Sequence, residues 1–511
     1  MFEFEQAGIE QAVGGPKSAV LGVATDTRKL QVGNAFFCIP GPNFDSHEFA
    51  GPALDKGASV VVIRRDRWSA LRESIDPSLH SRIYYADDVL DSMQRLAAIH
   101  RRNQDYVVIG VTGSNGKTSA KEMLLSMLTD LVGDAVDGTT GNLNNHIGVP
   151  LTILNLKPNL KYAVIEMGMN HAGEIDLLAS IAAPDHGLIT SIGRAHIEFF
   201  YSKRGIARAK LELMPHCTRS LTFPADGIGK SHLLRLQRSN PIAVQIFGGP
   251  KGWTSIPAVV SAGFRADSAR AIANGASAIG PAPASGTQIQ PWKEFHSIDL
   301  QYDAQGLRFR IGNEDSTTGP IIENRHYSSA VQASNLLGCL AVLQASGFSA
   351  EQLQSVASAA RPSSSGRFTV HRASHRILVD DSYNANPDSF LAALESLRKM
   401  APQGRLLCLA GAMAELGARA EEAHLEVGRR CKDLDIELKA CGHPVAKFYR
   451  DPMESDASQG NGFFFADSSE LADHIYRNPQ EYLSYDGILA KGSRSARMER
   501  ACEALMRIGY V

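Results

Sequence analysis

The sequence predicts an α/β protein of three domains. Its 511 residues exceed the length that one hydrophobic core usually supports, so several domains are expected. A glycine-rich turn, VTGSNGKTS, lies between an apolar run and an amphipathic stretch, as in nucleotide-binding α/β domains. After residue 366, apolar runs alternate with helical stretches, which predicts a further domain with a largely parallel sheet.

The first 105 residues are expected to form a small α/β domain. Its candidate strands are the apolar runs AFFCI (35–39), ASVVVI (58–63) and IYYA (83–86), and its last helix is expected near DSMQRLAAIHRRN. The chain start, MFEFEQAGIEQAVGG, carries acids where a secretory signal would carry positive charge. We therefore expect a cytoplasmic protein.

The central domain, residues 106–362, is expected to open with a phosphate-binding loop. Residues 106–111 form a β-branched run suited to a buried strand, and apolar residues recur at helical spacing after the turn. Between them, Gly113 and Gly116 permit a tight turn in which backbone N–H groups and the positive end of the helix converge on an anion.

Two side chains of the turn supply what a nucleoside triphosphate needs. Lys117 adds a mobile positive charge, and the Thr118 hydroxyl can ligate Mg²⁺. The usual pattern G-x-x-x-x-G-K-[ST] has glycine at position 111, where this chain has Val111 and carries its glycine one place earlier. A bare strand–turn–helix connection is the alternative, but it would not need lysine and threonine together. We expect ATP or GTP phosphates to bind at Gly113, Ser114, Asn115, Gly116, Lys117 and Thr118.

Polar residues follow further strands of this domain. Glu166 ends the run YAVIE, where a carboxylate suits Mg²⁺. His196 follows the run HGLITSIG, although a lone histidine is more often a satisfied polar group. Lys210 lies in the helical stretch GIARAKLEL, where a solvated lysine is the plain alternative. The loop GNLNNHIGVP, with Asn144 and Asn145, either presents amides to a polar substrate or is an elaborate turn.

Residues 218–320 are expected to be less regular than the rest of the central domain. The stretch ARAIANGASAIGPAPASGTQ (269–288) is rich in Ala, Gly, Ser and Pro, as flexible surface connections often are. A polar break, PSSSG (362–366), then separates the C-terminal domain, residues 363–511. Its expected strands are RILVDD, LLCLAG, IELKACG, GFFFAD and GILAKG, and ligands are expected at the polar clusters DDSYNANPDS, GAMAELG and KGSRSARME that follow strand ends.

Composition excludes several classes of protein. Lysine and arginine number 52 against 54 aspartate and glutamate, so no broad basic surface is expected for nucleic acid. No apolar run approaches the roughly 18 residues that a membrane helix needs. Seven cysteines form no C-x-x-C pair, which argues against a disulfide framework and a zinc site, and most are expected in the core.

Eight segments, in their order and wording, resemble the Mur ligases. They are VTGSNGKTSAKEM, GNLNNHIGVPLTIL, EMGMNHAGEI, SIGRAHIE, GIARAK, DDSYNANPDS, GAMAELG with His424 after it, and KGSRSARME. DDSYNANP and EMGMN are typical of the branch that adds D-alanyl-D-alanine to UDP-N-acetylmuramoyl-tripeptide. The resemblance implies an N-terminal domain for the UDP-sugar, a central P-loop ATPase domain, and a C-terminal Rossmann-like domain that closes over the site.

The resemblance also implies a reaction in peptidoglycan precursor synthesis. The terminal carboxylate of the tripeptide attacks the γ-phosphate of ATP, and the amine of D-alanyl-D-alanine then displaces phosphate from the acyl phosphate to form an amide. Phosphoryl transfer between anions calls for positioning and for cations rather than for a nucleophile of the protein. ATP and Mg²⁺, in two ions, are the implied cofactors. We expect no nucleic-acid partner, no membrane segment and a monomeric chain.

Site residues follow from the same resemblance. The implied catalytic residues are Lys117, His196 and Lys210, the last as a carbamate, and the implied Mg²⁺ ligands are Thr118, Glu166 and His196. Arg367, Asp381 and Asn384 are expected on the nucleotide side of the cleft. The substrates are expected at Thr27, Arg28, Asp45, His47, Asn144, Asn145, Lys491, Ser493 and Arg494, the first four in TDTRKLQVGNAFFCIPGPNFDSHEF, which is similar to the family's uridine-binding stretch.

Departures from the family pattern leave two alternatives open. Where the family has Gly-x-His-Asn before Asn335, residues 329–332 read Ser-Ala-Val-Gln. Phe199 and Tyr201 stand where the family has glycines, and Ala412 replaces a common acid. These changes motivate the alternative of a nucleotide-binding module without ligase activity. Within the family, the alternative is a ligase that adds a single amino acid, against which DDSYNANP argues.

Overall fold

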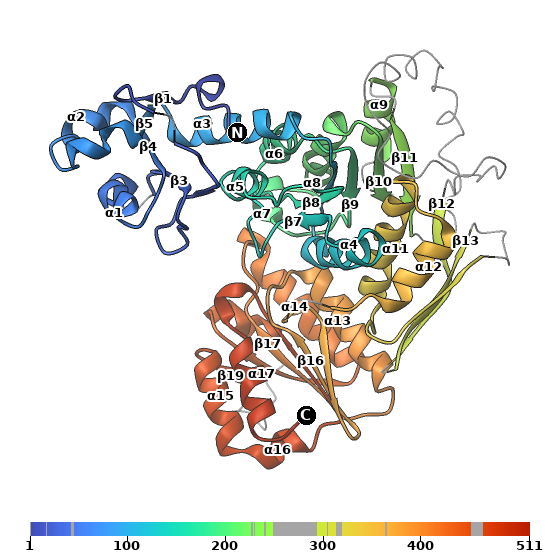
Figure 1. The fold of residues 1–511 in the computed structure, drawn as a ribbon. Coiled ribbons are helices and arrows are strands. Elements are labelled where there is room, and N and C mark those ends of the chain that lie inside the picture. Colours follow the sequence, from blue (N-terminus) through green and yellow to red (C-terminus); the bar gives the residue numbers. More distant parts are fainter. Residues whose placement is uncertain are drawn as a thin grey trace, which may run out of the picture.

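A computed structural model gives the fold of the chain, and the residues that it describes form three sheets, each covered by helices (Figure 1). The predicted α/β class is confirmed, and each sheet falls within one of the three expected domains. The boundaries 1–105, 106–362 and 363–511 stay predictions. The structure describes residues 2–16, 18–41, 45–225, 228, 230–239, 242–248, 294–303, 305–312, 319–362, 365–450 and 463–511.

The N-terminal sheet has the strand order β1-β5-β4-β3-β2 over the described residues. All of its pairs are parallel except β1 with β5. The three expected strands are confirmed as β3, β4 and β5. The strands are β1 (Glu10–Gln11), β2 (Gly22–Ala24), β3 (Asn34–Phe37), β4 (Val60–Arg64) and β5 (Ile83–Ala86), and the helices are α1 (Ala50–Asp55), α2 (Trp68–Leu71) and α3 (Val89–Arg102).

Helix α3 and the strand β2 connect this domain to the central one. Arg101, near the end of α3, is buried and donates to the Ala182 carbonyl at 3.1 Å and to Asp185 at 3.2 Å. The Asn155 carboxamide forms two hydrogen bonds with the backbone of Val23, of 2.8 and 2.9 Å. The N-terminal domain is therefore fixed to the central domain by buried polar contacts as well as by packing.

The central sheet has the order β14-β13-β12-β11-β10-β9-β6-β8-β7, where the structure describes it. Pairs from β7 to β12 are parallel, and β12, β13 and β14 pair antiparallel. Its strands are β6 (Val107–Thr112), β7 (Val136–Gly138), β8 (Tyr162–Glu166), β9 (His186–Ile189), β10 (Ser220–Pro224), β11 (Ala243–Phe247), β12 (Glu294–Asp303), β13 (Gly306–Gly312) and β14 (Ile321–Asn324). Its helices are α4 (Lys117–Val132), α5 (Gly148–Leu154), α6 (Glu174–Ala182), α7 (Ile197–Phe200), α8 (Lys203–Lys210), α9 (Lys230–Ser239), α11 (Ala330–Ala345) and α12 (Ala350–Ala359).

The expectation of irregular structure over residues 218–320 is wrong for the residues that are described there. Strands β10 to β13 and helix α9 come from this segment and extend the central sheet. The reason is that polar residues interrupt the two runs, Ser220 and Thr222 in SLTFP and Gln245 in AVQIF, so neither stands out as an apolar strand. The stretch 269–288, expected to be a flexible connection, lies outside the described residues.

The C-terminal sheet has the order β15-β16-β20-β17-β18-β19 among its described strands. Only β15 with β16 is antiparallel, so the predicted parallel sheet and its five expected strands are confirmed. The strands are β15 (Thr369–Ala373), β16 (Arg376–Asp381), β17 (Leu406–Gly411), β18 (Ile436–Cys441), β19 (Phe464–Phe465) and β20 (Gly487–Lys491). The helices are α13 (Pro387–Met400), α14 (Ala420–Asp433), α15 (Ser468–Arg477), α16 (Pro479–Leu483) and α17 (Glu499–Arg507).

Two sequence expectations about composition can be compared with the fold. All seven cysteines are buried, as expected for core residues. No helix within the described ranges is long and apolar enough to cross a lipid bilayer.

The central strand β9 contains a buried histidine whose charge the fold opposes. His186 is 1% exposed, and one of its ring nitrogens lies 2.8 Å from the Ser220 hydroxyl. Burial lowers the pKa of His186 from 6.5 to about 4, because the charged form loses its hydration. The unfolded chain therefore binds a proton over this pH interval that the folded chain does not.

We predict that the free energy of unfolding falls as the pH drops from 6.5 toward 4. His186 alone should lower the free energy of unfolding by about 2 kcal/mol at pH 5 and by about 3 kcal/mol at pH 4, relative to neutral pH. Urea unfolding of the wild-type protein and of His186→Gln at pH 7 and pH 5 measures it, with the exposed His326→Gln as the matched control. An equal pH dependence in the wild-type protein and in His186→Gln would contradict the assignment.

Candidate active site

A cavity of about 960 Å³ lies between the central and C-terminal domains. Its lining residues follow the carboxyl ends of β6, β8 and β9 on one side and of β16, β17 and β20 on the other. Parallel sheets bind ligands at these ends, so two such sheets present their binding edges to one space. The polar clusters DDSYNANPDS, GAMAELG and KGSRSARME all contribute to the lining, as their positions after strands predicted.

The turn between β6 and α4 can be built only with glycine at two positions. Gly113 has a φ of +157° and Gly116 a φ of +80°, which side chains disfavour. A Cβ at Gly113 would overlap the buried Thr190 hydroxyl, and one at Gly116 would overlap the Asn335 carboxamide. The glycines thus serve both the backbone turn and the close approach of β9 and α11.

Residues after β9 fix the turn in place. The Ser114 N–H donates to the Ser191 carbonyl and the Asn115 N–H to the Ser191 hydroxyl, both at 2.9 Å. The Gly193 N–H donates to the Ser114 hydroxyl at 2.8 Å. The loop is therefore held before any ligand binds, which reduces the entropy that binding must offset.

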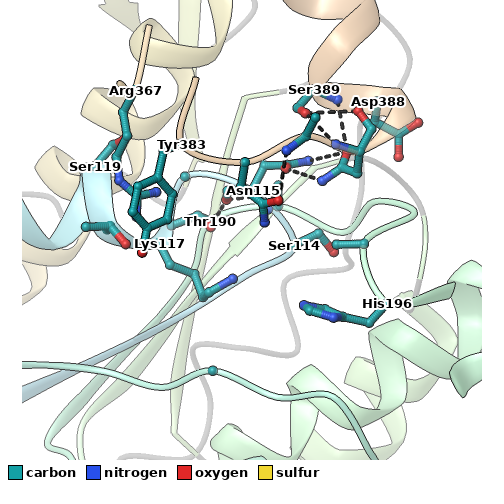
Figure 2. A pocket seen from close by; sticks show the side chains of 18 of the residues that line it. Ser114, Asn115, Lys117, Ser119, Thr190, His196, Arg367, Tyr383, Asp388 and Ser389 are labelled. Atoms are coloured by element: carbon teal, nitrogen blue, oxygen red, sulfur yellow. Dashed lines mark hydrogen bonds between the residues drawn. The ribbon is translucent and has the colours of Figure 1, made fainter. Parts of the chain in front are cut away.

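Lys117, the first residue of α4, folds back over the turn. Its ammonium donates to the Gly113 carbonyl at 2.9 Å, and Figure 2 shows the side chain beside Thr190 in the cavity. Burial lowers the pKa of Lys117, while the nearby Glu166 carboxylate acts in the opposite direction. The lysine is thus placed to close a ring of donors around a phosphate.

Glu166 places a carboxylate with one unpaired oxygen beside the turn between β6 and α4. The residue is 1% exposed, and its Oε1 accepts from the Thr118 hydroxyl at 3.0 Å and from the Asn144 amide at 2.8 Å. Its Oε2 is buried and has no hydrogen-bond partner among the described residues. A buried carboxylate oxygen without a partner is costly, and a hard cation with oxygen ligands satisfies it. The residues present therefore fit Mg²⁺.

Two residues that the sequence did not suggest support Glu166 from behind. The Glu166 N–H donates to the Thr139 hydroxyl at 2.9 Å, and the Lys121 ammonium donates to the Thr139 carbonyl at 2.8 Å. Lys121 is fully buried. In the sequence, a lysine one helical turn after Lys117 and on the apolar face of the expected helix could have indicated this role. Within the described chain no group of three or more His, Cys, Asp and Glu side chains forms a metal site, so a cation here would need further oxygens from phosphate or water.

His196 and Lys210 lie near this centre in different ways. His196 adopts a φ of +58° and brings its Nδ1 to 2.7 Å from Glu415 Oε2, outside hydrogen-bond geometry. Contact with His196, and the charge of Lys117, lower the pKa of Glu415. Lys210 ends α8 and is 1% exposed, and its ammonium forms no hydrogen bond or ion pair with the described residues. Burial, and then the charge of Lys117, lower the pKa of Lys210 well below its usual value. Lys210 does not line the cavity itself.

On the C-terminal side, an ion pair organises the residues expected to bind nucleotide and dipeptide. The Lys491 ammonium is buried and lies 2.5 Å from Asp381 Oδ2 and 3.0 Å from the Asn384 carbonyl. The Arg367 guanidinium stacks over the Tyr383 ring at 3.9 Å, as Figure 2 shows. All five residues line the cavity, as do Ser493 and Arg494.

Other predicted positions have structural partners. The Asn145 side chain accepts from the N–H groups of residues 147 and 148, just before and at the start of α5, and the residue also lines the cavity. Asp45 and His47 form a contact of 2.6 Å, and His47 accepts from the Arg64 N–H at 3.0 Å. Arg28 pairs with a neighbouring aspartate. Thr27, Arg28, Asp45 and His47 do not line this cavity, and their predicted role with the UDP-sugar stays a prediction.

Residues 329–332, which depart from the family pattern before Asn335, form contacts of their own. Gln332 is buried, accepts from the Ser328 N–H at 2.9 Å, and donates to the Phe368 carbonyl of the C-terminal domain at 3.3 Å. Val331 is 37% exposed and lines the cavity. An apolar surface therefore stands where the family pattern has a histidine.

Two family models match the chain. The Mur ligase middle domain matches residues 111–244, and the glutamate ligase domain of Mur ligases matches residues 366–494. The chain is 31% identical over 488 residues to the UDP-N-acetylmuramoyl-tripeptide–D-alanyl-D-alanine ligase of Escherichia coli (strain K12), covering 95% of this chain and 94% of the relative. It is 27% identical over 493 residues to the ligase of the same name from Bacillus subtilis (strain 168), covering 96% and 94%.

Solved structures give the same result. The chain superimposes on MurF from Acinetobacter baumannii with a TM-score of 0.77 and 25% identity, covering 99% of this chain and 98% of that one. It also shares the fold of the MurF ligase from Thermotoga maritima in complex with ADP, with a TM-score of 0.74 and 24% identity, covering 97% and 99%. These likenesses extend over all three sheets.

We predict that Gly116→Ala weakens ADP binding by roughly tenfold or more, because it strains a positive φ and displaces the Asn335 carboxamide. Gly133→Ala is the matched control, since Gly133 ends the same helix with a φ of +70° but has open space around its Cβ position. Calorimetric titration with ADP measures both affinities. Equal affinities for the two variants would contradict the role of the turn.

Proposed function

The chain belongs to the Mur ligase family, and on that premise we propose that it joins D-alanyl-D-alanine to UDP-N-acetylmuramoyl-tripeptide in peptidoglycan precursor synthesis, with ATP converted to ADP and phosphate. One observation carries the proposal. A phosphate loop with a buried, incompletely paired carboxylate faces the segment DDSYNANPDS across a single cavity. The relatives in the D-alanyl-D-alanine branch match the chain over nearly its full length.

The first step activates the tripeptide. A carboxylate oxygen of the tripeptide bonds to the γ-phosphorus of ATP as the bond to the β–γ bridging oxygen breaks, which gives an acyl phosphate and ADP. The N–H groups at the start of α4, which have no partner within the helix, and the Lys117 ammonium bind the phosphate oxygens, where charge is greatest. Repulsion between the two anions is lowered, and no nucleophile of the protein is needed.

Thr118 and Glu166 are the residues that would hold Mg²⁺, with His196 for a second ion. Bound there, Mg²⁺ neutralises charge on the phosphates. Asn144 and Thr118 hold the Glu166 carboxylate beside the loop, and Thr139 holds the Glu166 backbone N–H. Glu415, close to His196, belongs to the C-terminal domain, so the carboxylate reaches the histidine only when the two domains meet.

The second step forms the amide. The amine of D-alanyl-D-alanine bonds to the acyl carbon, the bond from that carbon to the phosphate oxygen breaks, and phosphate leaves with a proton lost from nitrogen. We place the dipeptide between residues 382–388 and 491–494, where Lys491 holds Asp381 and the Asn384 carbonyl in a fixed arrangement. Residues of both domains exclude water, which would otherwise hydrolyse the acyl phosphate.

Lys210 carries a further part of the proposal, a carbamate. A lysine buried without a partner, with a lowered pKa, is neutral more readily than an exposed one. The neutral amine bonds to the carbon of CO₂ and loses a proton, which leaves an anion. The positive charge of Lys117, which disfavours an ammonium at Lys210, would stabilise that anion.

We assign the remaining roles by the same family likeness. The domain at residues 1–105 would bind the UDP-sugar through Thr27, Arg28, Asp45 and His47, the domain at 106–362 would bind ATP, and the domain at 363–511 would close over both. Arg367, Asp381 and Asn384 would face the nucleotide. We also propose a cytoplasmic location and a monomer, because the substrates are made of nucleotide and peptide parts and the cavity is complete within one chain.

The test of the function combines ATP, Mg²⁺ and UDP-N-acetylmuramoyl-tripeptide with and without D-alanyl-D-alanine. We expect dipeptide-dependent phosphate release and a product with the mass of the pentapeptide, for a tripeptide that carries either meso-diaminopimelate or lysine. Lys117→Ala should lower the rate by roughly a hundredfold or more. Amide formed with single amino acids would indicate another ligase step, and bound ATP without any amide would indicate a non-catalytic module.

We predict that [¹³C]bicarbonate gives a carbamate carbon resonance in the wild-type protein that is absent from Lys210→Ala. Lys203→Ala is the matched control, because Lys203 begins the same helix and its side chain is 39% exposed. The resonance should persist in this control. A wild-type protein without the resonance in excess bicarbonate would contradict the carbamate and leave the ligase reaction unaffected.

A further inference from the structure

Arg194, in the loop between β9 and α7, binds two acidic side chains of the C-terminal domain. Its backbone N–H donates to Asp388 Oδ2 at 2.6 Å, and its Nε donates to Asp388 Oδ1 at 2.8 Å. Its two terminal nitrogens donate to the two oxygens of Glu426, at 2.5 and 3.1 Å. A guanidinium that is bidentate to one carboxylate and also binds a second holds both in a defined orientation.

These groups are partly withdrawn from water, Glu426 less so than the other two. The side chains of Arg194 and Asp388 are 24% and 26% exposed, and that of Glu426 is 40% exposed. Their attraction is therefore screened less than that of an ordinary surface pair. Asp388 lies at the start of α13 and Glu426 in α14, so one side chain of the central domain fixes two helices of the other domain.

Both ends of this contact are continuous with the phosphate loop. On the central side, Gly193 precedes Arg194 and binds the Ser114 hydroxyl. On the C-terminal side, Asn386, which begins α13, donates from its amide to the Asn115 carboxamide oxygen at 2.6 Å. Figure 2 shows Asp388 and Ser389 beside Asn115 of the loop. A shift of α13 away from Arg194 would therefore also open the contact with the loop.

We propose that Arg194, Asp388 and Glu426 form a domain clamp, and that Arg194 is a positioning residue for the second step of the reaction. The clamp holds the C-terminal domain over the phosphate loop while the acyl phosphate exists, so that the dipeptide amine reaches the acyl carbon before water does. This inference rests on the proposed function, which supplies the acyl phosphate.

Loss of the clamp has a specific chemical consequence. In a site that opens early, a water oxygen bonds to the acyl carbon, the bond from that carbon to the phosphate oxygen breaks, and phosphate leaves. The carboxylate is regenerated and the net reaction is hydrolysis of ATP. The ratio of amide formed to phosphate released therefore reports on the clamp, whereas a role limited to folding would not change it in the folded enzyme.

The experiment compares Arg194→Ala and Glu426→Gln with the wild-type enzyme. Arg430→Ala is the matched control, because Arg430 forms a 3.0 Å pair with Glu395 between the same two helices but inside one domain. We expect about one amide per phosphate in the wild-type enzyme and in the control. In Arg194→Ala we expect several phosphates per amide, with kcat for amide lowered roughly tenfold and KM for ATP within about twofold.

Two further measurements keep the outcomes distinct. In a double-mutant cycle, Arg194→Ala with Glu426→Ala should lose no more amide turnover than Arg194→Ala alone, because Arg194→Ala already removes the contact with Glu426. Small-angle scattering should give a larger radius of gyration for Arg194→Ala than for Arg430→Ala.

The clamp would be overturned if Arg194→Ala kept the wild-type ratio of amide formed to phosphate released, or if Arg430→Ala lowered that ratio equally. Either result would leave the ligase reaction standing. A wild-type protein that forms no amide would instead overturn the proposed function. In that case small-angle scattering would still test the clamp. Equal radii of gyration for Arg194→Ala and Arg430→Ala would reject it.

Discussion

Glu166 brings a negative charge into the interior of the central domain, and the rest of the site is arranged around that charge. Its Oε1 is held by Thr118 and Asn144, while its Oε2 has no partner in the described chain. Burying a carboxylate with an unsatisfied oxygen is costly unless cations and donors compensate for it. The turn at residues 113–118 supplies them, since Lys117 and the helix start point to the same place. The arrangement that suits this carboxylate is also the one that a magnesium-bound triphosphate requires.

A site of this kind must also keep water from the activated carboxylate, and the fold does so with a second domain. The cavity is shared by two parallel sheets that face each other with their carboxyl ends. Neither sheet alone encloses it. Contacts across the boundary come from side chains close to the phosphate loop, such as Asn115 with Asn386 and His196 with Glu415. The hydrogen bond from Gln332 to the Phe368 carbonyl is a further contact between the two domains. Closure of the domains and assembly of the reactive centre are therefore one structural event.

Local patterns in the sequence predicted much of this structure. Strands β3 to β6, β8, β9 and most of the C-terminal sheet follow from apolar runs, and the turn at 113–118 follows from its glycines, lysine and threonine. Strands β10 and β11 were missed because polar residues interrupt their apolar runs. Lys121 was missed although its helical spacing from Lys117 was available. Glu415 and Arg194 were missed for a different reason. Each acts through a partner distant in the sequence, and no local spacing encodes which acid meets which base once the domains are closed.

The central claim is that the carboxylate of the tripeptide becomes an acyl phosphate. Labelling that carboxylate with ¹⁸O before ligation tests the claim most directly, because the bridging oxygen leaves with phosphate when the amine bonds to the acyl carbon. We predict one ¹⁸O atom in the inorganic phosphate for each amide formed, as measured by mass spectrometry. Amide formation with unlabelled phosphate would contradict the mechanism, since the oxygen would then have left by a route that does not pass through phosphorus.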